Sequence, residues 1–462
     1  MSHAQAVNLW PDPQALGPVT DLYQLTMMAG YLATGMADRR ATFELFVRKL
    51  PPHRSYLVFA GLEQALGDLL RLSFSPAQVE GIRRFPVFRD ADPAFFELLS
   101  RVRFRGDLWA VPEGTVVFPG ETLVRVEAAI LEAQWIETFL LASLAYPTLV
   151  ASKAARIVSV ARGRSLFDFG ARRGHGPHAG LLAARSAYLA GFDGTSQAEA
   201  ARLLGIPAAG TMAHSWVQAF DQERDAFEAF ARVFPGATTL LVDTYDTLQG
   251  VREAAEITPP IQAIRLDSGD LASLAPAARS ILDQQGRSDV KILASGDLDE
   301  YQVDRLLEAG APIDGFGIGT ELITSRDAPA LAMVYKLVEL EGQGRFKLSP
   351  GKKTYPMGKQ VYRQRDSRGQ FVGDLVTRAD EQALGEPLLV PWIRSGELIQ
   401  PFPSLQSVRE RCRQQLASLA DELKTLDSSV SYRVTYSDVL EADARRIMTE
   451  TVPATPNLQP KP

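Results

Sequence analysis

Cysteine is almost absent from this 462-residue sequence, in which Cys412 is the only one. A single cysteine can form neither an internal disulfide bond nor a zinc site built on cysteine ligands. Histidine is also scarce, with five in the whole chain. One of them, His214, stands in the stretch GTMAHSWV, between an apolar segment and a predicted helix. This placement makes His214 a candidate for chemistry, although a buried structural histidine is an alternative.

Long apolar runs are missing too: no stretch approaches the roughly 20 residues that would span a bilayer. Positive charge is not in excess, because 49 Lys and Arg face 55 Asp and Glu, for a formal charge of −6. The sequence therefore offers no basic face for a nucleic acid. The start, MSHAQAVNLWPDPQ, has no basic segment followed by an apolar core, as a secretory signal would have. We expect a cytoplasmic protein without nucleic-acid or membrane partners.

The first part of the chain mixes helical and strand patterns. TDLYQLTMMAGYL is typical of a helix and TFELFV of a strand, and another helix is predicted near Glu63 to Leu70. VPEGTVVFPGETLVRVE contains two β-rich runs broken by Pro-Glu-Gly and Pro-Gly, which is hairpin chemistry. These patterns predict an α+β domain over residues 1–130.

From about Ser165 to Ile323 one unit recurs: a short apolar run, a small or acidic residue, then a helical pattern. The successive strand ends are predicted in SLFDFG, AYLAGFDGTS, PAAGTMAHS, TTLLVDTYD, QAIRLDSGD, KILASGD and DGFGIGTEL. They are 20 to 29 residues apart, and a barrel of eight such units in about 250 residues averages about 31 per unit. This spacing predicts a compact or irregular TIM-like α/β barrel over 131–344, with a doubly wound open sheet as the alternative.

After Lys347 the sequence becomes polar and rich in turns. GKKT from Gly351 resembles a phosphate-binding loop, but Phe346 and Lys353 stand where that motif needs Gly and Ser or Thr. Val408 to Leu426 is typical of a late surface helix, and the proline-rich end predicts a flexible tail. We therefore expect a C-terminal helix and tail over 406–462.

If the recurring runs are barrel strands, the polar residues that follow them share one rim, where sites of this fold are built. Taken singly, Asp267 or Ser268 could be only a helix cap. Together, the rim residues suit a metal-bound, multiply phosphorylated sugar, because helix amides bind phosphate and carboxylates hold Mg²⁺. The rim set comprises Asp243, Arg265, Asp267, Asp270, Ser295, Gly296, Asp297, Gly317, Gly319 and Thr320.

An ordered set of motifs strongly resembles nicotinate phosphoribosyltransferase, of the type II phosphoribosyltransferase family: TDLYQLTMMAGY, FELFVRKLP, DPAFFELL, LFDFGARRGHGPHAG, GFDGTS, GTMAHS, LVDTYDT, RLDSGDL and GIGTELIT. The resemblance runs from about Thr20 to Lys347 and continues in FPSLQSVRE. It implies an irregular TIM-like α/β barrel beside an N-terminal open-faced α/β sandwich, which we expect residues 345–405 to complete. It also implies a homodimer with shared active sites.

The activity that the resemblance implies joins nicotinate to C1 of 5-phosphoribosyl 1-diphosphate, with ATP as co-substrate and Mg²⁺ as cofactor. Nicotinate mononucleotide and diphosphate are released, in the first step of NAD salvage by the Preiss–Handler pathway. Loss of diphosphate gives C1 oxocarbenium character, so such a site needs charge stabilisation more than a strong base.

The same resemblance assigns roles on the barrel rim. It implies that Asp267 holds the ribose hydroxyls and that Arg265 faces the reacting base and diphosphate. No metal ligand is assigned directly, although Asp267 could act through Mg²⁺. Backbone amides would hold the 5-phosphate at Gly296, Gly317, Gly319 and Thr320, while Asp243 and Ser295 complete the expected substrate-binding set.

The pyridine ring would lie between Tyr23 and Phe169, with Arg172 near the ring and its phosphates; plain core packing is the alternative for both aromatic residues. His214 would be the phosphorylated histidine, which takes the γ-phosphoryl group of ATP, and Ser215 beside it could cap the following helix. Ser196 stands where nicotinamide-using relatives have an aspartate, which favours the acid as substrate.

Three other functions stay open at this point. A nicotinamide phosphoribosyltransferase would share the fold but prefer the amide. A quinolinate phosphoribosyltransferase would not need His214 and is usually a shorter chain. A catalytically silent, nucleotide-binding barrel would have no chemical need for Arg265, Asp267 and His214 together.

Overall fold

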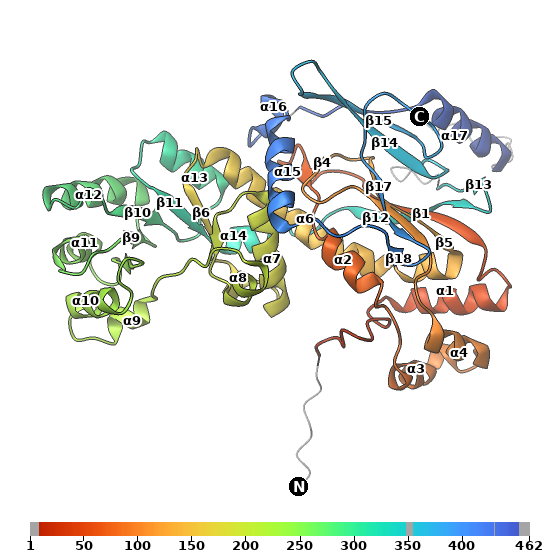
Figure 1. Ribbon diagram of the computed structural model, residues 1–462, viewed down its shortest axis with the longest axis horizontal. Helices are drawn as coiled ribbons and strands as arrows, with labels where there is room; N and C mark the ends of the chain where they lie inside the picture. Colours follow the sequence, from red (N-terminus) through yellow and green to blue (C-terminus); the bar gives the residue numbers. More distant parts are fainter. Residues whose placement is uncertain (1–8, 348–353, 429, 452–462) are drawn as a thin grey trace, which may run out of the picture.

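The chain forms two lobes on either side of a long helix (Figure 1). The computed structural model describes residues 9–347, 354–428 and 430–451. One lobe is built on antiparallel strands and the other on a parallel sheet, so the protein has a mixed α/β fold. None of the helices within the described residues is long and apolar enough to cross a membrane.

A seven-stranded sheet, in the order β13-β12-β1-β5-β3-β17-β18, is the centre of the first lobe. The predicted strand TFELFV lies in β1, which pairs antiparallel with both β5 and β12. Strand β12 falls inside the range 131–344 that the sequence assigned to the barrel, but it belongs to this sheet. The strands are β1 (Arg40–Val47), β3 (Asp107–Ala110), β5 (Thr122–Ala129), β12 (Met333–Leu340), β13 (Gln343–Gly344), β17 (Val390–Arg394) and β18 (Glu397–Leu398).

Helices cover this sheet, and the first of them contains all but the first two residues of the motif TDLYQLTMMAGYL, which was predicted to be helical. The helix predicted near Glu63 is α2. The elements are α1 (Leu22–Ala33), α2 (Leu62–Leu69), α3 (Pro76–Arg83), η1 (Pro86–Phe88), α4 (Pro93–Arg101) and α5 (Ile130–Trp135), with the strand pair β2 (Leu57–Val58) and β4 (Val116–Val117).

The segment around β2 joins the two hydrophobic cores of the protein. Tyr56, Val58 and Ala60 pack into the core of the second lobe, whereas Leu57 and Phe59 pack into the core of the first. Alternate side chains of an extended chain point to opposite faces, so one short segment can serve both cores. The two lobes are therefore packed together, not merely tethered.

A smaller sheet, in the order β16-β14-β15-β19, completes the first lobe together with the last helix (Figure 1). The predicted helix from Val408 to Leu426 is two helices, of which α15 buries Val408 and Cys412 completely. Burial raises the pKa of the Cys412 thiol to about 12, so this thiol is unreactive. The elements are β14 (Lys359–Arg365), β15 (Phe371–Arg378), β16 (Glu386–Pro387), α15 (Leu405–Ala417), α16 (Asp421–Lys424), β19 (Val434–Tyr436) and α17 (Asp438–Thr451). The GKK part of the GKKT motif and the predicted tail from 452 onward lie outside the described residues.

The second lobe contains a parallel sheet in the order β7-β6-β11-β10-β9-β8. Six of the seven predicted strand ends follow these strands. The seventh, PAAGTMAHS, forms only a single bridge between Ala208 and Thr195, in a segment where Pro207 has no N–H to offer a neighbouring strand. Among the described residues the sheet is thus an open, curved half-barrel with edges β7 and β8, and a closed eight-stranded barrel is not present.

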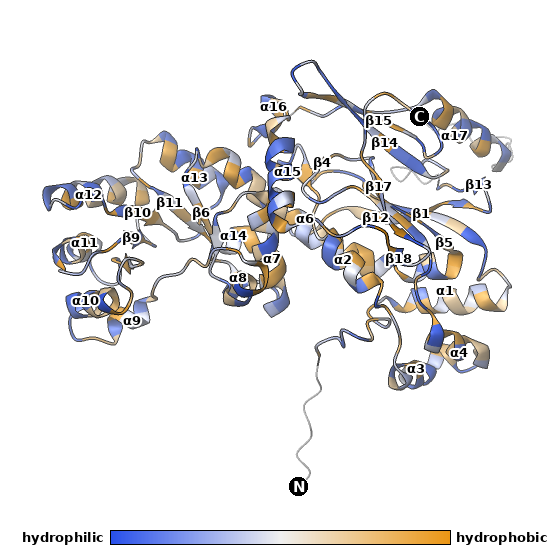
Figure 2. Cartoon of the chain, viewed as in Figure 1, coloured by the Kyte–Doolittle hydropathy of each residue, from blue (hydrophilic) through white to orange (hydrophobic). Residues whose placement is uncertain are grey.

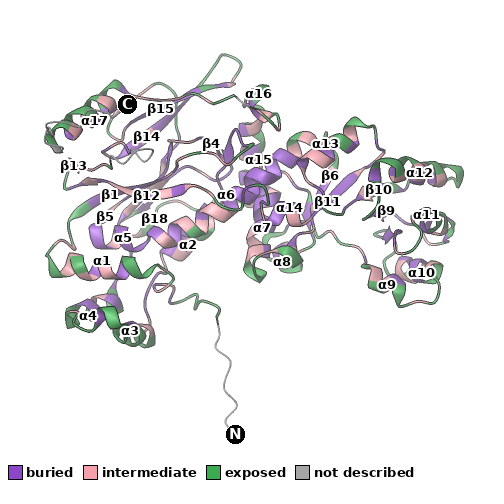
Figure 3. Ribbon diagram, turned by 180° about the vertical axis from the view of Figure 1, so that it is seen from behind, coloured by how far each residue is buried: buried purple, intermediate pink, exposed green. Residues whose placement is uncertain are grey.

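Helices lie around this sheet, and its strands are shielded by them (Figure 3). All four residues of β11 are buried, as expected for a parallel strand covered on both faces. In α11 the buried residues Val251, Ala254 and Ala255 recur with helical spacing, and the outer faces of the helices are hydrophilic (Figure 2). The elements are β6 (Ser165–Asp168), η2 (Ala171–Arg173), α7 (Pro177–Ala190), β7 (Gly194–Thr195), α8 (Ala198–Leu204), α9 (His214–Gln218), α10 (Glu223–Val233), β8 (Thr239–Leu241), α11 (Thr247–Glu256), β9 (Ala263–Leu266), α12 (Leu271–Gln284), β10 (Lys291–Ala294), α13 (Glu300–Glu308), β11 (Gly315–Ile318) and α14 (Thr320–Ile323).

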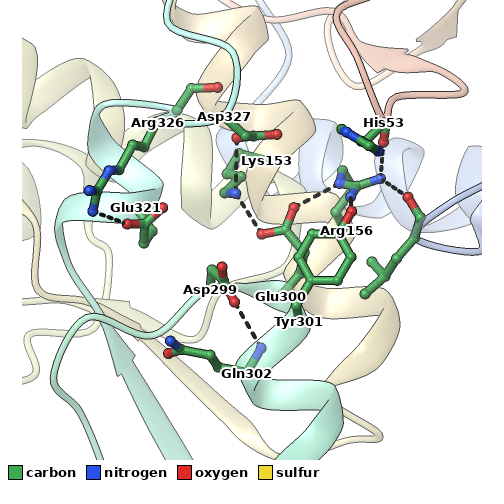
Figure 4. Close-up of polar contacts among 12 residues, drawn as sticks. His53, Lys153, Arg156, Asp299, Glu300, Tyr301, Gln302, Glu321, Arg326 and Asp327 are labelled. Carbon is green, nitrogen blue, oxygen red and sulfur yellow. Dashed lines mark hydrogen bonds and ion pairs between the residues drawn. The ribbon is translucent and has the colours of Figure 1, made fainter.

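Helix α6 (Glu137–Val160) joins the lobes and carries two buried cations, Lys153 and Arg156. Both pair with the buried carboxylate of Glu300 at the start of α13, at 2.6 and 2.9 Å (Figure 4). Lys153 also lies 2.9 Å from Asp327, which in turn pairs with Arg54 at 3.0 Å. This buried ion network connects the first lobe, α6 and the helices of the parallel sheet.

Candidate active site

Polar side chains from three neighbouring strand ends converge at the carboxyl edge of the parallel sheet. Ser295, after β10, donates its hydroxyl to Oδ1 of Asp267 at 2.5 Å. The backbone N–H of Asp267 donates to Oδ2 of Asp243 at 3.1 Å, and the same oxygen accepts from the Ser268 hydroxyl at 2.5 Å. The ends of β8, β9 and β10 are thus joined through side chains, as the sequence predicted.

Asp267 and Ser268 are not the helix cap of this segment. The cap of α12 is Asp270, whose Oδ1 accepts from the backbone N–H of Ala272 at 3.2 Å. The side chain of Asp267 remains 32% exposed, and it faces the rim instead of the backbone of its own helix. The rim position of Asp267 is therefore available to a ligand.

His214 is the first residue of α9 and reaches the same cluster from the side. Its Nδ1 lies 3.1 Å from Oγ1 of Thr244, and its Nε2 lies 4.0 Å from Oδ2 of Asp267. The ring is 41% exposed. The prediction that Ser215 caps this helix is wrong, because the N-cap residue is Ala213 and no side chain caps the helix. His214 is thus oriented through Thr244 and presents Nε2 toward Asp267.

Arg265 lies on β9 beside Phe169. Its Nη1 donates to Thr211 Oγ1 at 3.0 Å and its Nη2 to the Met212 carbonyl at 3.3 Å, while the guanidinium carbon is 5.9 Å from the centre of the Phe169 ring. Burial lowers the pKa of Arg265, and the charges of Asp267 and Asp243 offset this effect only in part. A partly desolvated cation of this kind interacts strongly with an anion.

Close approach explains two of the predicted glycines. A Cβ on Gly317 would lie 2.3 Å from the Phe169 ring, and a Cβ on Gly296 would lie 2.0 Å from the carbonyl oxygen of Asp267. Gly296 also has a φ of +98°, in the left-handed region that favours glycine. The backbone at Gly296 therefore packs directly against the catalytic candidate Asp267.

The other phosphate candidates, Gly319 and Thr320, lie at the beginning of α14, where Gly319 is the N-cap residue. Their strand, β11, is bonded to both β6 and β10, so this helix start lies between the Phe169 turn and the Ser295 turn. Backbone N–H groups at such a position can bind an anion.

Three predicted residues lie at the margin of the cluster or away from it. Ser196 follows β7, is exposed, and donates its backbone N–H to the Asp168 carbonyl at 2.8 Å. Arg172 is exposed in η2, three residues after Phe169. Tyr23, in contrast, is 47% exposed on α1 of the first lobe, so the chain does not bring it to Phe169 (Figure 1). Burial, followed by the charge of Glu137, raises the pKa of Tyr23 to about 12.

Comparison with known proteins identifies the chain. Residues 19–145, 164–375 and 382–443 match the N-terminal domain, the family and the C-terminal domain described for nicotinate phosphoribosyltransferase. Nicotinate phosphoribosyltransferase pncB2 of Mycobacterium tuberculosis is 49% identical over 436 residues, which cover 93% of each chain. The chain belongs to the nicotinate phosphoribosyltransferase family. The Bacillus subtilis nicotinate phosphoribosyltransferase is 37% identical over 91% of this chain and 92% of its own.

Two solved structures have the same architecture. The crystal structure of human nicotinic acid phosphoribosyltransferase superposes with a TM-score of 0.83 at 31% identity, covering 92% of this chain and 99% of the human one. The nicotinate-nucleotide pyrophosphorylase of Pyrococcus furiosus gives a TM-score of 0.72 at 26% identity, covering 90% and 99%. The two-lobed fold is thus that of the nicotinate phosphoribosyltransferase family.

Several residues that shape the candidate site of this nicotinate phosphoribosyltransferase family member were not predicted from the sequence. Thr211 binds Arg265, and Thr244 binds His214. The only feature in the sequence that could have indicated either threonine is its position next to a predicted strand end or motif. Asp168 is buried, and burial raises its pKa. Its carboxylate accepts from the Gly170 N–H and the Thr195 hydroxyl, both at 2.8 Å, which fixes the turn that carries Phe169.

The acidic residues of the rim suit a metal that is held mainly by substrate. Within the described residues, no three His, Cys, Asp or Glu side chains are arranged to hold a metal ion. Oδ1 of Asp243 is nevertheless buried without a hydrogen-bond partner among these residues. Mg²⁺ commonly uses one or two carboxylates together with substrate phosphates and water. Asp243 and Asp267 could supply the two carboxylates of such a site, in which substrate and water provide the remaining ligands of the ion.

Proposed function

We propose that the chain is a nicotinate phosphoribosyltransferase that forms nicotinate mononucleotide from nicotinate and 5-phosphoribosyl 1-diphosphate in NAD salvage. The observation that carries this proposal is the cluster of Asp243, Asp267, Ser295, Arg265 and His214 on one rim, in a chain of this family. The pyridine nitrogen attacks C1, the bond from C1 to the diphosphate oxygen breaks, and the electron pair leaves with diphosphate. ATP is hydrolysed to ADP and phosphate in the coupled reaction.

In this reaction the rim residues would bind and stabilise charge. Asp267, held by Ser295, would accept from the ribose hydroxyls as C1 becomes positively charged, while Arg265 would face the base and diphosphate. The 5-phosphate would be held at backbone N–H groups of Gly296, Gly317, Gly319 and Thr320. Preorganised dipoles of this kind stabilise the transition state without reorganisation.

Asp243 and Asp267 would also hold Mg²⁺ together with the diphosphate. When bound, the ion would neutralise the charge that develops on the leaving diphosphate. Asp243 supports this role, since its Oδ1 is buried and lacks a hydrogen-bond partner in the described part of the chain.

The first prediction concerns His214, whose Nε2 would accept the γ-phosphoryl group of ATP. The Nε2–P bond forms, the bond from the γ-phosphorus to the bridging oxygen breaks, and the electron pair leaves with ADP. Because only the ATP-dependent step needs this acceptor, His214→Ala should retain some phosphoribosyl transfer and lose its stimulation by ATP. Wild type should carry acid-labile, base-stable ³²P from γ-labelled ATP, and His214→Ala none. Equal labelling of the two proteins would contradict the assignment.

The pyridine ring would be stacked on Phe169, near Arg172, with Tyr23 supplied by a second copy of the chain. Support comes from the place of Tyr23, which is exposed on the lobe opposite the Phe169 turn (Figure 1). A homodimer in which each first lobe reaches the partner's rim would complete both sites.

Hybrid dimers test this arrangement. If Tyr23 acts in the partner's site, mixing Tyr23→Ala with Asp267→Ala should restore activity, because one site in each hybrid dimer is then free of both substitutions. Each variant alone should have little activity. An enzyme that sediments as an active monomer would contradict the shared site.

Substrate choice is the main test of the proposed function and depends on Ser196. A carboxylate substrate opposite an aspartate would place two like charges in a partly dry pocket, whereas the serine hydroxyl can donate a hydrogen bond to it. Hydrogen-bonding sites discriminate strongly between polar partners, so wild type should prefer nicotinate to nicotinamide by at least about 10²-fold in kcat/KM. Ser196→Asp should reduce this preference.

The measurement is diphosphate release with nicotinate, nicotinamide and quinolinate as separate substrates. A wild type that prefers nicotinamide would favour the amide-using alternative and overturn the proposal, and one that uses only quinolinate would do the same. Absence of release with all three pyridines would favour a silent, nucleotide-binding protein.

We also infer two finer features of the protein. The segment from Ala208 to His214 bridges β7 at Thr195 and reaches Thr244, after β8, through His214, so it would close an irregular TIM-like barrel without forming a full strand. A cytoplasmic location suits the phosphorylated substrates and the free thiol of Cys412, since cytosolic thiols stay reduced. Fractionation of cells followed by immunodetection tests the location.

A further inference from the structure

A cavity outside the candidate active site lies between α15 and the small four-stranded sheet. Its volume is about 570 Å³, within the range of roughly 300–1,000 Å³ that is common for small-molecule sites. None of the residues assigned to the candidate active site lines it. In Figure 1, α15 lies between the two lobes and β14 lies in the first lobe, whereas α11 and α12 lie at the far end of the second lobe. The cavity is therefore separate from the proposed catalytic centre.

Arg411 on α15 is the main cation of this cavity and is incompletely paired. A guanidinium has five N–H donors, and Nη1 of Arg411 donates to the backbone carbonyl of Glu113 at 3.0 Å. The Glu113 carboxylate itself is occupied by Arg185, at 2.8 Å for each of two hydrogen bonds. Burial lowers the pKa of Arg411, and the charges of Glu113 and Glu386 offset this effect only in part. The guanidinium thus has hydrogen-bonding capacity left for an anion.

The rest of the wall contains one more guanidinium, one carboxylate, neutral polar side chains and apolar residues. Arg365 pairs with Glu386 and donates to the Ser418 hydroxyl, both at 3.0 Å. The two arginines outweigh the single carboxylate of Glu386, so the cavity has a net positive charge. Leu388 and Val390 supply an apolar surface beside them. This pairing of charge and apolar wall suits a molecule with an anionic head and a small organic body.

We propose that this cavity binds a small metabolite with a phosphate monoester group, and that Arg411 and Arg365 hold the phosphate. The forked guanidinium matches the oxygen geometry of phosphate. The cavity volume leaves room for an organic body larger than phosphate alone.

Contacts connect this site to the lobe of the parallel sheet. Glu113, whose carbonyl binds Arg411, also holds Arg185 of α7 and accepts from the backbone N–H of Gly61. Helix α7 begins shortly after η2, which carries Arg172. A phosphate bound by Arg411 is therefore two hydrogen bonds away from α7: Arg411 binds Glu113, and Glu113 binds Arg185 of α7.

Calorimetric titration with inorganic phosphate and with glycerol 3-phosphate tests the site. The full chain is compared in four forms: wild type, Arg411→Met, Glu386→Gln and Arg413→Met. Arg411→Met should weaken binding at this site at least about tenfold, because a charge-assisted hydrogen bond contributes more than the free energy of a tenfold change in affinity. Glu386→Gln should tighten it, since a carboxylate that repels the anion is removed. Wild type and Arg413→Met should bind alike, because Arg413 is on the same helix but exposed and paired with Glu410 at 2.7 Å.

The outcome for Glu386→Gln keeps the test independent of folding, since a damaged protein would not bind more tightly. Unchanged affinity in Arg411→Met would overturn the proposal, as would a Glu386→Gln variant that binds no tighter than wild type. Acetate binding as tightly as phosphate would overturn the assignment of the ligand class.

Discussion

Asp267→Ala is expected to lower kcat by about 10² to 10³, the range for loss of one preorganised electrostatic contact in an active site. The carboxylate is held by Ser295 at 2.5 Å and lies beside His214, yet it is 32% exposed and free to meet a substrate hydroxyl. Its loss removes the group that would meet positive charge at C1. Steady-state diphosphate release at saturating substrates measures the effect.

Asp270→Ala is the matched control, because this residue lies three positions later and is a helix cap. It should cost about 1 kcal/mol of stability, as loss of an N-cap does, and leave kcat within threefold of wild type. Circular dichroism should show both variants folded. If Asp267→Ala also stays within threefold of wild type, Asp267 does not take part in catalysis.

The rim could be predicted from the sequence because parallel strands are buried on both faces and so appear as short apolar runs. Asp243, Asp267 and Ser295 each follow such a run directly, and strand order then brings them together without knowledge of other contacts. His214 was predicted for the rim because its segment was taken as one more strand end. The segment forms only a bridge at Ala208, yet His214 lies at the rim, where it contacts Thr244 and Asp267.

Long-range pairing could not be predicted in the same way. Strand β12 has the local pattern of one more barrel strand, and only its pairing with β1, almost 300 residues earlier, puts it in the antiparallel sheet. The cap of α9 was misplaced, because a cap depends on the backbone angle at one residue. Ser215 is the better cap by composition, but the observed N-cap is Ala213. For α12, where Asp267 or Ser268 was the cap alternative to a rim position, the observed N-cap is Asp270.

The buried ion network is the feature that sequence patterns hide most fully. Arg54, Lys153, Glu300 and Asp327 come from four distant segments, and in the sequence each resembles an ordinary surface charge. Figure 4 shows the side chains of Lys153, Glu300 and Asp327 pointing toward one another. The packing of α6 against α13 buries Lys153 and Glu300, and Arg54 is buried as well, whereas the side chain of Asp327 stays 25% exposed. The network is therefore predicted to matter for stability and for the joining of the lobes, and not for catalysis.

Glu300→Gln should be strongly destabilising, at about 3–5 kcal/mol, because removal of one partner leaves buried charges without compensation. Glu300 is fully buried and pairs with both Lys153 and Arg156. Burial opposes its ionisation, but the charges and hydrogen bonds of these two cations lower its pKa below the ordinary value of 4.5. A lowered pKa gives stability that is present above pH 4.5 and is lost as the pH falls through the native pKa.

Thermal unfolding of wild type and variants from about pH 2 to about pH 8, a range that extends well below the unfolded pKa of Glu300, measures this effect, with Tm as the readout. The Tm difference between wild type and Glu300→Gln should be largest near neutral pH and should shrink in acid, where Glu300 of wild type also becomes neutral. Asp304→Asn is the matched control on the same helix, since Asp304 pairs with the half-exposed Arg162 at 2.8 Å, and loss of such a pair costs only about 0–1 kcal/mol. Equal Tm values for Glu300→Gln and Asp304→Asn at neutral pH would show that the buried network does not stabilise the junction of the lobes.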